Sequence, residues 1–318
     1  MSTNLKQDLQ GIQENVLLAD YTTLKIGGPA KLFVEVTNET ELKDAIQKAN
    51  GNMIPYFILA GGSDVLISDS GFDGLVILFR IKGIKAKGQN LLVKSGTKLQ
   101  DLIDTANKHG LGGIEKLTDI PGSVGGAVYG NAGAYGKTIS DHIRRVQVFN
   151  GTKVFWMSKE DCNFQYRESI FKKNKKLTIL EIEFELQKQS SKDLQKVSRE
   201  IRKIRRQKYN DGLKSPGSFF KNIIADNLSP EILERIPKDK INYGKISTGY
   251  LLEAVGAKGK KLDGVEVASY HGNLFLNRGS GTAKAFFTLA KKYKDKVKEK
   301  FGIDLEPEVQ LIGFKKQL

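Results

Sequence analysis

The sequence contains one cysteine and three histidines, too few for the disulfide frameworks and zinc sites that stabilise many proteins. Cys162 has no partner for an intrachain disulfide, and His109, His142 and His271 lack the spacing of zinc ligands. No stretch is long and apolar enough to span a bilayer, and the N-terminus has no apolar signal core. We therefore expect a cytoplasmic protein with no structural metal and no membrane partner.

Acidic residues are outnumbered, with 36 Asp and Glu against 51 Lys and Arg, and the formal net charge is +15. Such an excess suits nucleic acid, a membrane surface or small anionic ligands. The densest basic runs are 172–176, 202–208 and 291–300, and the last two have helical periodicity, typical of the solvated face of an amphipathic helix. No nucleic-acid-binding motif accompanies them, so we predict anionic ligands and no nucleic-acid partner.

Glycine is abundant, with 33 residues, and six of them fall within the stretch IPGSVGGAVYGNAGAYG, at 120–136. Glycine backbone turns sharply and brings its N–H groups against a ligand, as in loops that hold a pyrophosphate. The competing interpretation is a series of tight turns. The stretch lacks the Gly-Lys-Ser/Thr ending of a P-loop and the strand-GxGxxG-helix context of a dinucleotide-binding fingerprint.

Hydrophobic periodicity predicts a chain of mixed helices and strands. Strands are expected at 32–36, 56–60, 74–79, 91–95, 143–149, 153–157, 176–186 and 308–312, with a further strand-turn-strand within 264–277. Helices are expected after caps at Asn38 or Thr40, Thr97 and Thr282, at 250–255, and from Ser191 to about 210–212. The helix from Ser191 should bury Leu194, Val197, Ile201 and Ile204. Composition changes near Gln207, which indicates a domain boundary.

Five motifs follow one another in the chain: AGGSDVL, the glycine-rich stretch, YRESIF, PGSFFKN and LEPEVQLIG. In this order they resemble the UDP-N-acetylenolpyruvoylglucosamine reductases, also called UDP-N-acetylmuramate dehydrogenases (the MurB family), from about Thr22 to Gly313. The resemblance implies an α+β protein with an FAD-binding domain of the vanillyl-alcohol-oxidase (PCMH) type and a smaller substrate domain. We accordingly predict an FAD-binding region at 1–206 (subdomains 1–68 and 69–206), a substrate domain at 207–302 and a C-terminal strand at 303–318.

The resemblance also implies an activity. A monomeric enzyme would use NADPH and FAD to reduce UDP-N-acetylglucosamine enolpyruvate to UDP-N-acetylmuramate, a precursor of peptidoglycan. Saturating an enolpyruvyl ether needs a hydride on the CH₂ carbon, which flavin N5 would supply, and a proton on the carbon bearing the carboxylate. The alternatives are a flavin enzyme of the same fold acting on another small molecule, and a basic nucleic-acid-binding protein without flavin.

Three residues match the catalytic positions of the family. Ser218, in PGSFFKN, is implied to be the proton donor, although a serine after Pro-Gly also suits a turn. Arg167, in YRESIF, would hold the substrate carboxylate through its guanidinium fork. Glu308 corresponds to the catalytic glutamate of the family, and Glu306 is its competitor because strand alternation places both on one face.

Other positions are carried over as binding residues. For the substrate these are Lys208 and Asn222. For FAD they are Gly61, Gly62, Ser63, Asp64, Pro121, Gly122, Ser123, Gly125, Gly126, Asn131, Ala132 and Gly133.

The sequence departs from the family pattern at several positions. Asp64 stands where Asn is usual and would place a carboxylate near the flavin phosphates, and Ile223 replaces the usual Pro. Lys25 occupies a position where Arg is common, and His-Gly-Asn at 271–273 replaces His-Ala-Asn. The stretch 223–247 is longer than in many family members, which leaves the enzyme subtype open.

Overall fold

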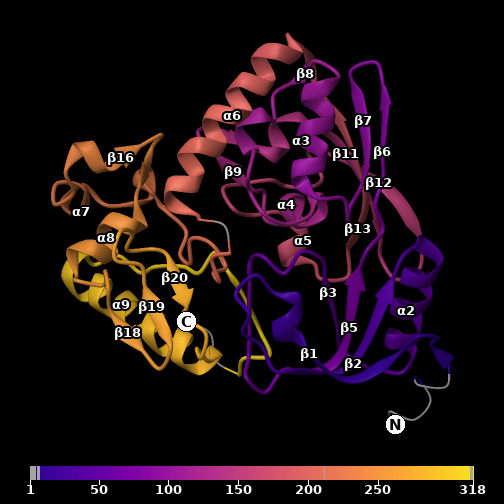
Figure 1. Ribbon diagram of the computed structural model, residues 1–318, viewed down its shortest axis with the longest axis horizontal. Helices are drawn as coiled ribbons and strands as arrows, with labels where there is room; N and C mark the ends of the chain where they lie inside the picture. Colours follow the sequence, from indigo (N-terminus) through magenta and orange to yellow (C-terminus); the bar gives the residue numbers. More distant parts are fainter. Residues whose placement is uncertain (1–4, 6–7, 211, 316–317) are drawn as a thin grey trace. The chain divides into compact units, whose positions relative to one another are not determined.

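The computed structural model describes residue 5 and residues 8–210, 212–315 and 318. They form two compact units, each assembled from segments that are distant in the sequence (Figure 1). The first unit takes its described residues from Met1–Val16, Ala30–Gly61 and Asp73–Gln207. The second takes them from Leu17–Pro29, Gly62–Phe72 and Lys208–Leu318. Helices and strands are mixed in both units, as expected for the α+β class.

One part of the first unit is a four-stranded sheet covered by a helix. The strand order is β1 (Gln13–Leu17), β2 (Pro29–Val36), β5 (Phe72–Phe79) and β3 (Tyr56–Leu59). Helix α2 (Glu39–Gly51) begins after Asn38, whose side chain accepts a hydrogen bond from the Glu41 N–H at 3.0 Å. Its buried residues are the predicted Leu42, Ala45, Ile46 and Ala49. Periodicity and a capping side chain therefore predicted this helix correctly.

The other part of the first unit is an antiparallel sheet with two helices packed on one face (Figure 1). Its strand order is β12 (Val154–Ser158), β11 (Ile143–Phe149), β13 (Thr178–Glu185), β7 (Asn90–Lys94) and β6 (Ile84–Lys87). The helices are α3 (Leu99–Lys108) and α4 (Val124–Tyr129). Shorter elements are β8 (Leu111–Gly112), β9 (Gly133–Ala134), β10 (Lys137–Thr138), α5 (Ile170–Lys173) and β14 (Gln187–Lys188). Helix α4 is part of the glycine-rich stretch, so its packing on this sheet positions that stretch.

The predicted cap of α3 is wrong. The helix begins after Lys98, which makes no side-chain capping bond. The Thr97 hydroxyl instead accepts a hydrogen bond from the Gly83 N–H at 3.0 Å and donates one to the Gly83 carbonyl at 3.2 Å. Threonine satisfies backbone groups outside helices as well as at helix starts, so the residue type alone did not determine its partner.

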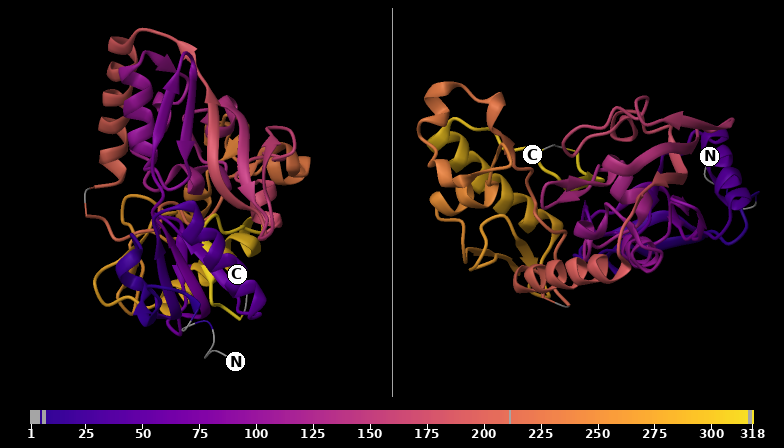
Figure 2. Two further views of the ribbon diagram at one scale, coloured as in Figure 1. Left: turned by 90° about the vertical axis from the view of Figure 1, so that its right-hand side faces the viewer. Right: turned by 90° about the horizontal axis from the view of Figure 1, so that it is seen from above.

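Helix α6 (Ser191–Lys208) lies beside α3 (Figure 2). The contact is polar: Ser198 is buried, and its hydroxyl lies 2.8 Å from Asn107 Nδ2 and 2.9 Å from Thr118 Oγ1. Leu194 and Ile201 are buried as predicted, but Ile204 is 50% exposed, so its predicted burial is wrong. The periodicity missed Ser198 because its burial depends on partners from elsewhere in the chain.

The second unit has a core of packed aromatic rings. Phe219, Phe220, Phe275 and Phe286 are fully buried, and the ring centroids of Phe219 and Phe220 are 4.9 Å apart. Helix α9 (Ala283–Phe301) covers this core; Thr282 caps its start, and Gly302 ends it with φ of 73°, as predicted. Further elements are α7 (Pro230–Leu233), α8 (Thr248–Ala254), β15 (Ile223–Ile224), β16 (Ile241–Asn242), β17 (Lys245–Ile246), β18 (Lys261–Leu262), β19 (Val265–Val267) and β20 (Phe275–Asn277).

A parallel strand pair joins distant parts of the sequence within the second unit. Strand β21 (Gln310–Ile312) pairs with β4 (Val65–Ile67), which follows the AGGSD motif directly. The Gln310 N–H donates to the Asp64 carbonyl at 3.0 Å and extends this pairing. The LEPEV motif near the C-terminus is thereby fixed next to a segment from the first quarter of the chain.

Candidate functional site

The glycine-rich stretch contains the short helix α4, which the sequence analysis did not predict. Ser123 caps it, accepting a hydrogen bond from the Gly126 N–H at 3.1 Å. Gly125 is packed without spare room, because a Cβ atom there would lie 1.8 Å from Ser95 Oγ. Gly61 similarly permits close approach, since its Cβ would lie 2.8 Å from the Gly122 Cα. The first two glycine motifs therefore meet backbone to backbone in the first unit.

Other features of the stretch are not explained by packing within the chain. Gly126 is exposed, and a Cβ there would contact only Ser123 Oγ, at 3.4 Å. Asn131 is buried; its Nδ2 donates to the Gln165 carbonyl at 2.8 Å, while Oδ1 has no hydrogen-bond partner among the described residues. An unsatisfied buried acceptor is costly, and a ligand N–H would satisfy it. Open space at Gly126 and this acceptor together fit a bound cofactor.

Two matched substitutions separate packing from ligand binding at these glycines. We expect Gly125→Ala to lower the free energy of unfolding of the apoprotein by about 1–3 kcal/mol, because the new methyl group overlaps Ser95. Gly126→Ala has room for its methyl group and should leave the apoprotein as stable or slightly more stable. It should nonetheless weaken flavin binding. Urea unfolding of both apoproteins and flavin titration followed by fluorescence test this. Unchanged flavin affinity of Gly126→Ala would remove this residue from the site.

Arg167 is held against the glycine-rich stretch. Its Nη2 donates to the Gly133 carbonyl at 2.8 Å and its Nη1 to the Asn131 carbonyl at 3.4 Å. Arg167 itself has a positive φ of 57°, a left-handed conformation that is costly for a residue with a Cβ. The Ser169 hydroxyl donates to the Tyr129 carbonyl at 2.6 Å and anchors the same loop. The guanidinium is thus oriented by the segment that carries the predicted cofactor residues.

The AGGSD motif is divided between the two units. Gly61 belongs to the first unit, whereas Gly62, Ser63 and Asp64 belong to the second. Gly62 has a packing role, because with φ of 59° its Cβ would lie 2.0 Å from the Tyr21 carbonyl oxygen. The Asp64 backbone carbonyl accepts the hydrogen bond from Gln310 that extends the β4–β21 pair. Gly62 and Asp64 therefore have structural tasks in addition to the binding roles predicted for them.

The PGSFFKN motif forms an extended segment between two others in the second unit. On one side Ser218 pairs with Leu274, and on the other Phe220 pairs with Pro307. The Glu308 N–H donates to the Phe219 carbonyl at 2.9 Å. The PGSFFKN motif, which carries the predicted acid Ser218, therefore lies next to the LEPEV motif, which carries Glu308. Gly217 has φ of 91°, which explains the glycine before Ser218. The structure thus brings Ser218 and Glu308 into neighbouring segments, while Arg167 belongs to the other unit.

Asn273 fixes the position of the Ser218 segment, although the sequence analysis gave it no role. Its Oδ1 accepts from the Phe220 N–H at 2.9 Å, and its Nδ2 donates to the Phe220 carbonyl at 2.7 Å. The Asn273 N–H donates to His271 Nδ1 at 3.1 Å, which leaves the imidazole proton on Nε2. The His-Gly-Asn tripeptide was noted only as a departure from the family pattern; its partners lie too far away in sequence for any pattern to show.

The two candidate glutamates have different surroundings. The Glu306 carboxylate pairs with Lys221 Nζ at 2.5 Å, and the Glu306 carbonyl accepts from the Lys221 N–H at 2.9 Å. Lys221 is buried, so its charge requires this partner. The pairing gives Glu306 a structural task, while the choice of Glu308 as the catalytic carboxylate continues to rest on the family motif.

The two predicted substrate residues, Lys208 and Asn222, both belong to the second unit. Asn222 Oδ1 accepts from the Thr248 N–H at 3.1 Å, which ties the motif to the start of α8. Lys208 is the last residue of α6, and its Nζ lies 4.9 Å from the centroid of the Tyr209 ring. The Tyr209 hydroxyl lies 3.3 Å from Ser218 Oγ. Tyr209 is a second residue that the sequence analysis missed.

His271 should make the protein acid-sensitive. Burial, aided by the positive charge of Lys208, lowers its pKa to about 4. Between pH 6.5 and pH 4 the unfolded chain, whose histidine pKa is about 6.5, binds a proton that the folded chain does not bind. The contribution of His271 to the free energy of unfolding is therefore fully present above pH 6.5 and is lost as the pH falls towards 4. This contribution is at most about 3 kcal/mol.

Urea unfolding at pH 7 and 4.5 tests this. The acid-induced loss of unfolding free energy should be smaller for His271→Gln than for the parent or for His109→Gln, an exposed control. Equal losses would contradict this.

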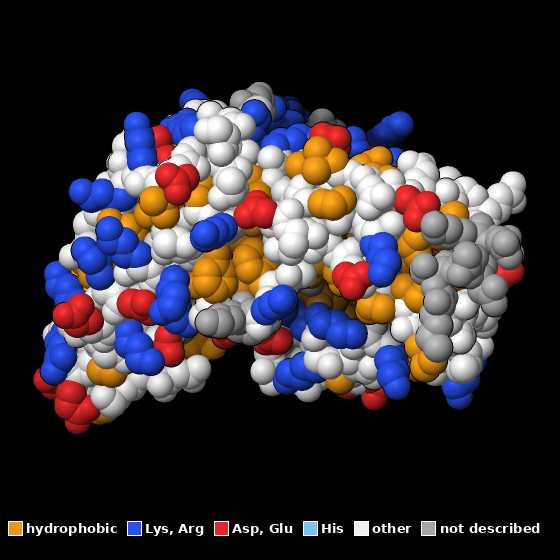
Figure 3. Space-filling model, turned by 90° about the horizontal axis from the view of Figure 1, so that it is seen from below, with side chains coloured by type: hydrophobic (Ala, Val, Ile, Leu, Met, Phe, Trp, Pro, Cys, Tyr) orange, Lys and Arg blue, Asp and Glu red, His pale blue; other side chains and the backbone are white. Residues whose placement is uncertain are grey.

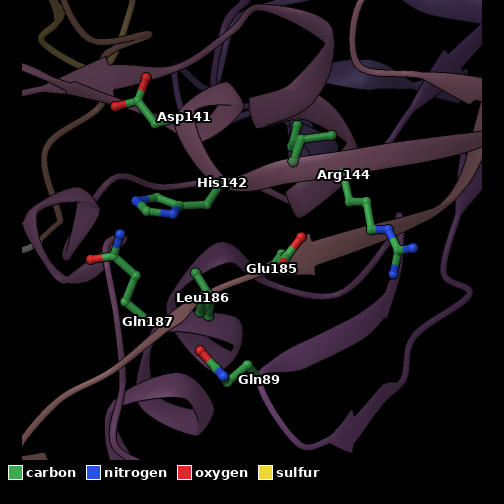
Figure 4. A pocket seen from close by; sticks show the side chains of 8 residues that line it. Gln89, Asp141, His142, Arg144, Glu185, Leu186 and Gln187 are labelled. Carbon is green, nitrogen blue, oxygen red and sulfur yellow. The ribbon is translucent and has the colours of Figure 1, made fainter.

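A separate small pocket lies in the first unit (Figure 4). Its volume is about 270 Å³, and none of the predicted site residues, all of which the structure describes, lines it. Asp141 in its wall accepts hydrogen bonds from the Thr138 N–H at 2.9 Å and hydroxyl at 2.6 Å, and Arg144 pairs with Glu183 at 3.2 Å. Figure 4 shows His142 and Gln187 on one side of the pocket and Arg144 on the other. Because Asp141 and Arg144 are engaged in these contacts, we assign the pocket no ligand.

Three other features bear on the class of protein. Within the described part of the chain, no group of three or more His, Cys, Asp or Glu side chains is arranged to hold a metal ion. Over the same residues, every helix is too short or too polar to cross a membrane. Cys162 is buried, and burial raises the pKa of its thiol to about 12, so it is an unreactive core residue.

The basic runs are partly neutralised where the structure describes them. Along α9, Lys291 pairs with Asp295 at 2.7 Å, and Asp304 accepts both Lys294 at 2.9 Å and Lys298 at 3.2 Å. On the face drawn in Figure 3, Lys and Arg side chains are interspersed with Asp and Glu. These observations favour the solvated-face interpretation of the α9 run.

Two family models match different parts of the chain. Residues 30–153 match the FAD binding domain family, and residues 207–312 match the UDP-N-acetylenolpyruvoylglucosamine reductase C-terminal domain. The UDP-N-acetylenolpyruvoylglucosamine reductase of Solibacter usitatus is 41% identical over 93% of this chain and 95% of its own. That of Clostridium novyi is 36% identical over 96% and 94%, respectively. The crystal structure of the reductase (MurB) from Thermus caldophilus matches with a TM-score of 0.75 and 29% identity, covering 95% of this chain and 99% of that one.

The fold and these matches define an FAD-containing oxidoreductase. The identity is high over nearly the full length of both chains, and the matched domains lie in the expected order. The chain belongs to the UDP-N-acetylenolpyruvoylglucosamine reductase family.

Proposed function

We propose that this protein reduces UDP-N-acetylglucosamine enolpyruvate to UDP-N-acetylmuramate with NADPH as reductant, in the synthesis of peptidoglycan precursors. The observation that carries the proposal is the juxtaposition of the Ser218 and Glu308 segments in a chain that shares 41% identity with a named reductase. The proposal includes action as a cytoplasmic monomer on small anionic ligands, with no nucleic-acid or membrane partner.

The cofactor would be held by residues of the glycine-rich stretch in the first unit, together with residues of the AGGSD motif. They are Gly61, Gly62, Ser63, Asp64, Pro121, Gly122, Ser123, Gly125, Gly126, Asn131, Ala132 and Gly133. FAD, when bound, supplies the hydride for the substrate CH₂ carbon from its N5 position. The remaining chemistry falls to the side chains of the protein.

Ser218 is the proton donor in this proposal. Its hydroxyl is presented by a rigid segment, since Phe219 and Phe220 are buried on one side and Asn273 satisfies both backbone groups of Phe220. A positioned acid typically contributes about 10²- to 10⁴-fold to the rate of such a proton transfer. The competing interpretation, a serine that only completes a turn, fits less well, because Ser215 already accepts from the Gly217 N–H at 3.1 Å.

Arg167 and Glu308 are proposed to act on the substrate carboxylate, where negative charge accumulates as the enolate forms. The guanidinium of Arg167 is oriented by the Gly133 and Asn131 carbonyls, so its orientation costs little when substrate binds. Glu308 is proposed to polarise the same region or the proton supply. Lys208 and Asn222 are proposed to contact the diphosphate or the sugar, and NADPH and the sugar nucleotide are both polyanions that suit a net charge of +15.

The departures from the family pattern concern binding more than chemistry. Asp64 would bring a carboxylate towards an anionic cofactor, and its backbone is fixed by Gln310. Ile223 begins β15, which pairs with β17 and belongs to the insert at 223–247. A proline at this position would lack the backbone N–H that a strand residue offers, so isoleucine suits the insert.

The test is the visible spectrum of the purified protein under anaerobic conditions. Flavin bands should bleach on addition of NADPH and return on addition of UDP-N-acetylglucosamine enolpyruvate. Bands that bleach but do not return would favour a flavin enzyme acting on another small molecule. A colourless protein that binds no added FAD, but binds nucleic acid with an affinity that falls steeply with salt, would replace the proposal by the non-catalytic alternative.

A further inference from the structure

Ser218 has a hydroxyl neighbour that neither the sequence motifs nor the catalytic proposal includes. The Tyr209 hydroxyl lies 3.3 Å from Ser218 Oγ, and both residues belong to the second unit. Hydrogen bonds between catalytic groups are often long before the substrate binds and shorten in the reacting complex. A tyrosine hydroxyl can donate to the serine oxygen while the serine proton points elsewhere.

The surroundings of Tyr209 hold its ring in place. The ring packs beside the small hydrophobic cluster of Ala268, Leu274 and Leu276, and Leu274 is the residue that pairs with Ser218. The residue before it, Lys208, is anchored by the Tyr270 hydroxyl, which donates to the Lys208 carbonyl at 3.2 Å. Leu274 thus fixes both hydroxyl-bearing residues: Ser218 by strand pairing and Tyr209 by packing against its ring.

The electrostatics favour negative charge on the Tyr209 oxygen during a proton transfer. Lys208 Nζ lies 4.9 Å from the centroid of the Tyr209 ring. A positive charge beside the ring stabilises negative charge that develops on the phenolate as a whole. Ser218, by contrast, would be left as an alkoxide after donating its proton, a species that is far less stable in a protein than a phenolate.

We propose that Tyr209 is the positioning residue of Ser218 and replaces the proton that Ser218 gives to the substrate. This inference rests on the proposed function. In the step, the Ser218 O–H bond breaks and a C–H bond forms at the substrate carbon bearing the carboxylate. The Tyr209 O–H bond breaks as its proton passes to Ser218 Oγ. The negative charge moves from the substrate enolate to the Tyr209 oxygen, which then takes a proton from water.

The test compares Tyr209→Phe with Tyr243→Phe in the full-length, FAD-loaded enzyme. Phenylalanine keeps the ring that packs on the cluster and removes only the hydroxyl. Tyr243 is the control, because it is 77% exposed and has no part in the proposed site. We expect Tyr209→Phe to slow product formation in a single turnover by about 10- to 100-fold. Flavin reduction by NADPH should stay within twofold of the parent, and Tyr243→Phe should match the parent in both steps.

A proton inventory separates proton supply from a structural role. Product formation in mixtures of H₂O and D₂O should give a curved plot for the parent, where two protons move together, and a straight line for Tyr209→Phe, where one moves. A Tyr209→Phe rate within twofold of the parent, an unchanged curved plot, or an equal loss in Tyr243→Phe would overturn the inference while leaving the proposed function intact. A parent enzyme that forms no product from the enolpyruvyl sugar would overturn the proposed function and this inference with it.

Discussion

Ser218→Ala should retain FAD and be reduced by NADPH at the parental rate, yet lose about 10²- to 10⁴-fold in turnover with the enolpyruvyl sugar. The substitution removes only the hydroxyl, and the Ser218 segment remains fixed by Asn273 on one side and by Glu308 on the other. The two half-reactions should therefore separate: flavin bleaching persists and its return on addition of the sugar nucleotide fails. Stopped-flow absorbance measures both steps in one sample.

The matched control for this variant is Ser215→Ala. The Ser215 hydroxyl accepts from the Gly217 N–H at 3.1 Å, so its loss loosens the same turn without removing the predicted acid. We expect a modest loss of stability, about 0.5–1.5 kcal/mol, and turnover close to that of the parent. Parental turnover in Ser218→Ala would show that the proton comes from another group. Equal losses in the two variants would show that the turn, and not the hydroxyl, is what matters.

Arg167→Lys should lower turnover by about 10- to 150-fold although the charge is kept, as expected for the loss of a charged hydrogen bond worth about 1.5–3 kcal/mol. The guanidinium is a planar fork with five N–H donors and donates to the carbonyls of Gly133 and Asn131, whereas a lysine ammonium lacks this fork. Because charge on the substrate carboxylate increases as the enolate forms, the loss should fall mainly on kcat.

Arg199→Lys, on the exposed face of α6, is the control for Arg167→Lys and should behave as the parent. Steady-state kinetics with the sugar nucleotide as the varied substrate measure kcat and KM for both. A change confined to KM would mean that Arg167 binds the substrate and its transition state equally. No change in either constant would remove Arg167 from the substrate site.

The helices with a clear cap and a clean apolar stripe could be predicted from the sequence. Both α2 and α9 have a side chain that bonds to the first turn and a regular buried face, so the local signals agree with the tertiary fold. Helix α4 has a capping side chain but no clear apolar stripe, because glycines at two of its six positions weaken the helical signal. It forms because Ser123 caps it and because close packing against Ser95 is possible only with glycine at position 125.

The site residues also fall into two groups: those that lie in a short motif, and those whose contacts come from elsewhere in the chain. Ser218, Arg167 and Glu308 lie in short motifs, so resemblance to the family was enough to predict them, and their roles stay predictions. Asn273 could not be predicted in this way, since its bonds to Phe220 span 53 positions of sequence and no spacing rule covers them. Tyr209 lies only nine positions from Ser218, but the turn between them makes the contact invisible to periodicity.

The interleaved course of the chain has a consequence for how the protein is made. The second unit needs both Gly62–Phe72 and β21, because β4 pairs in parallel with Gln310–Ile312, about 240 positions later in the sequence. During synthesis from the N-terminus, β4 must therefore wait with its edge unpaired until β21 has been made, while most of the first unit can already fold. Such late, long-range pairing slows folding and leaves an aggregation-prone strand exposed. Expression yield should consequently depend strongly on the integrity of β21.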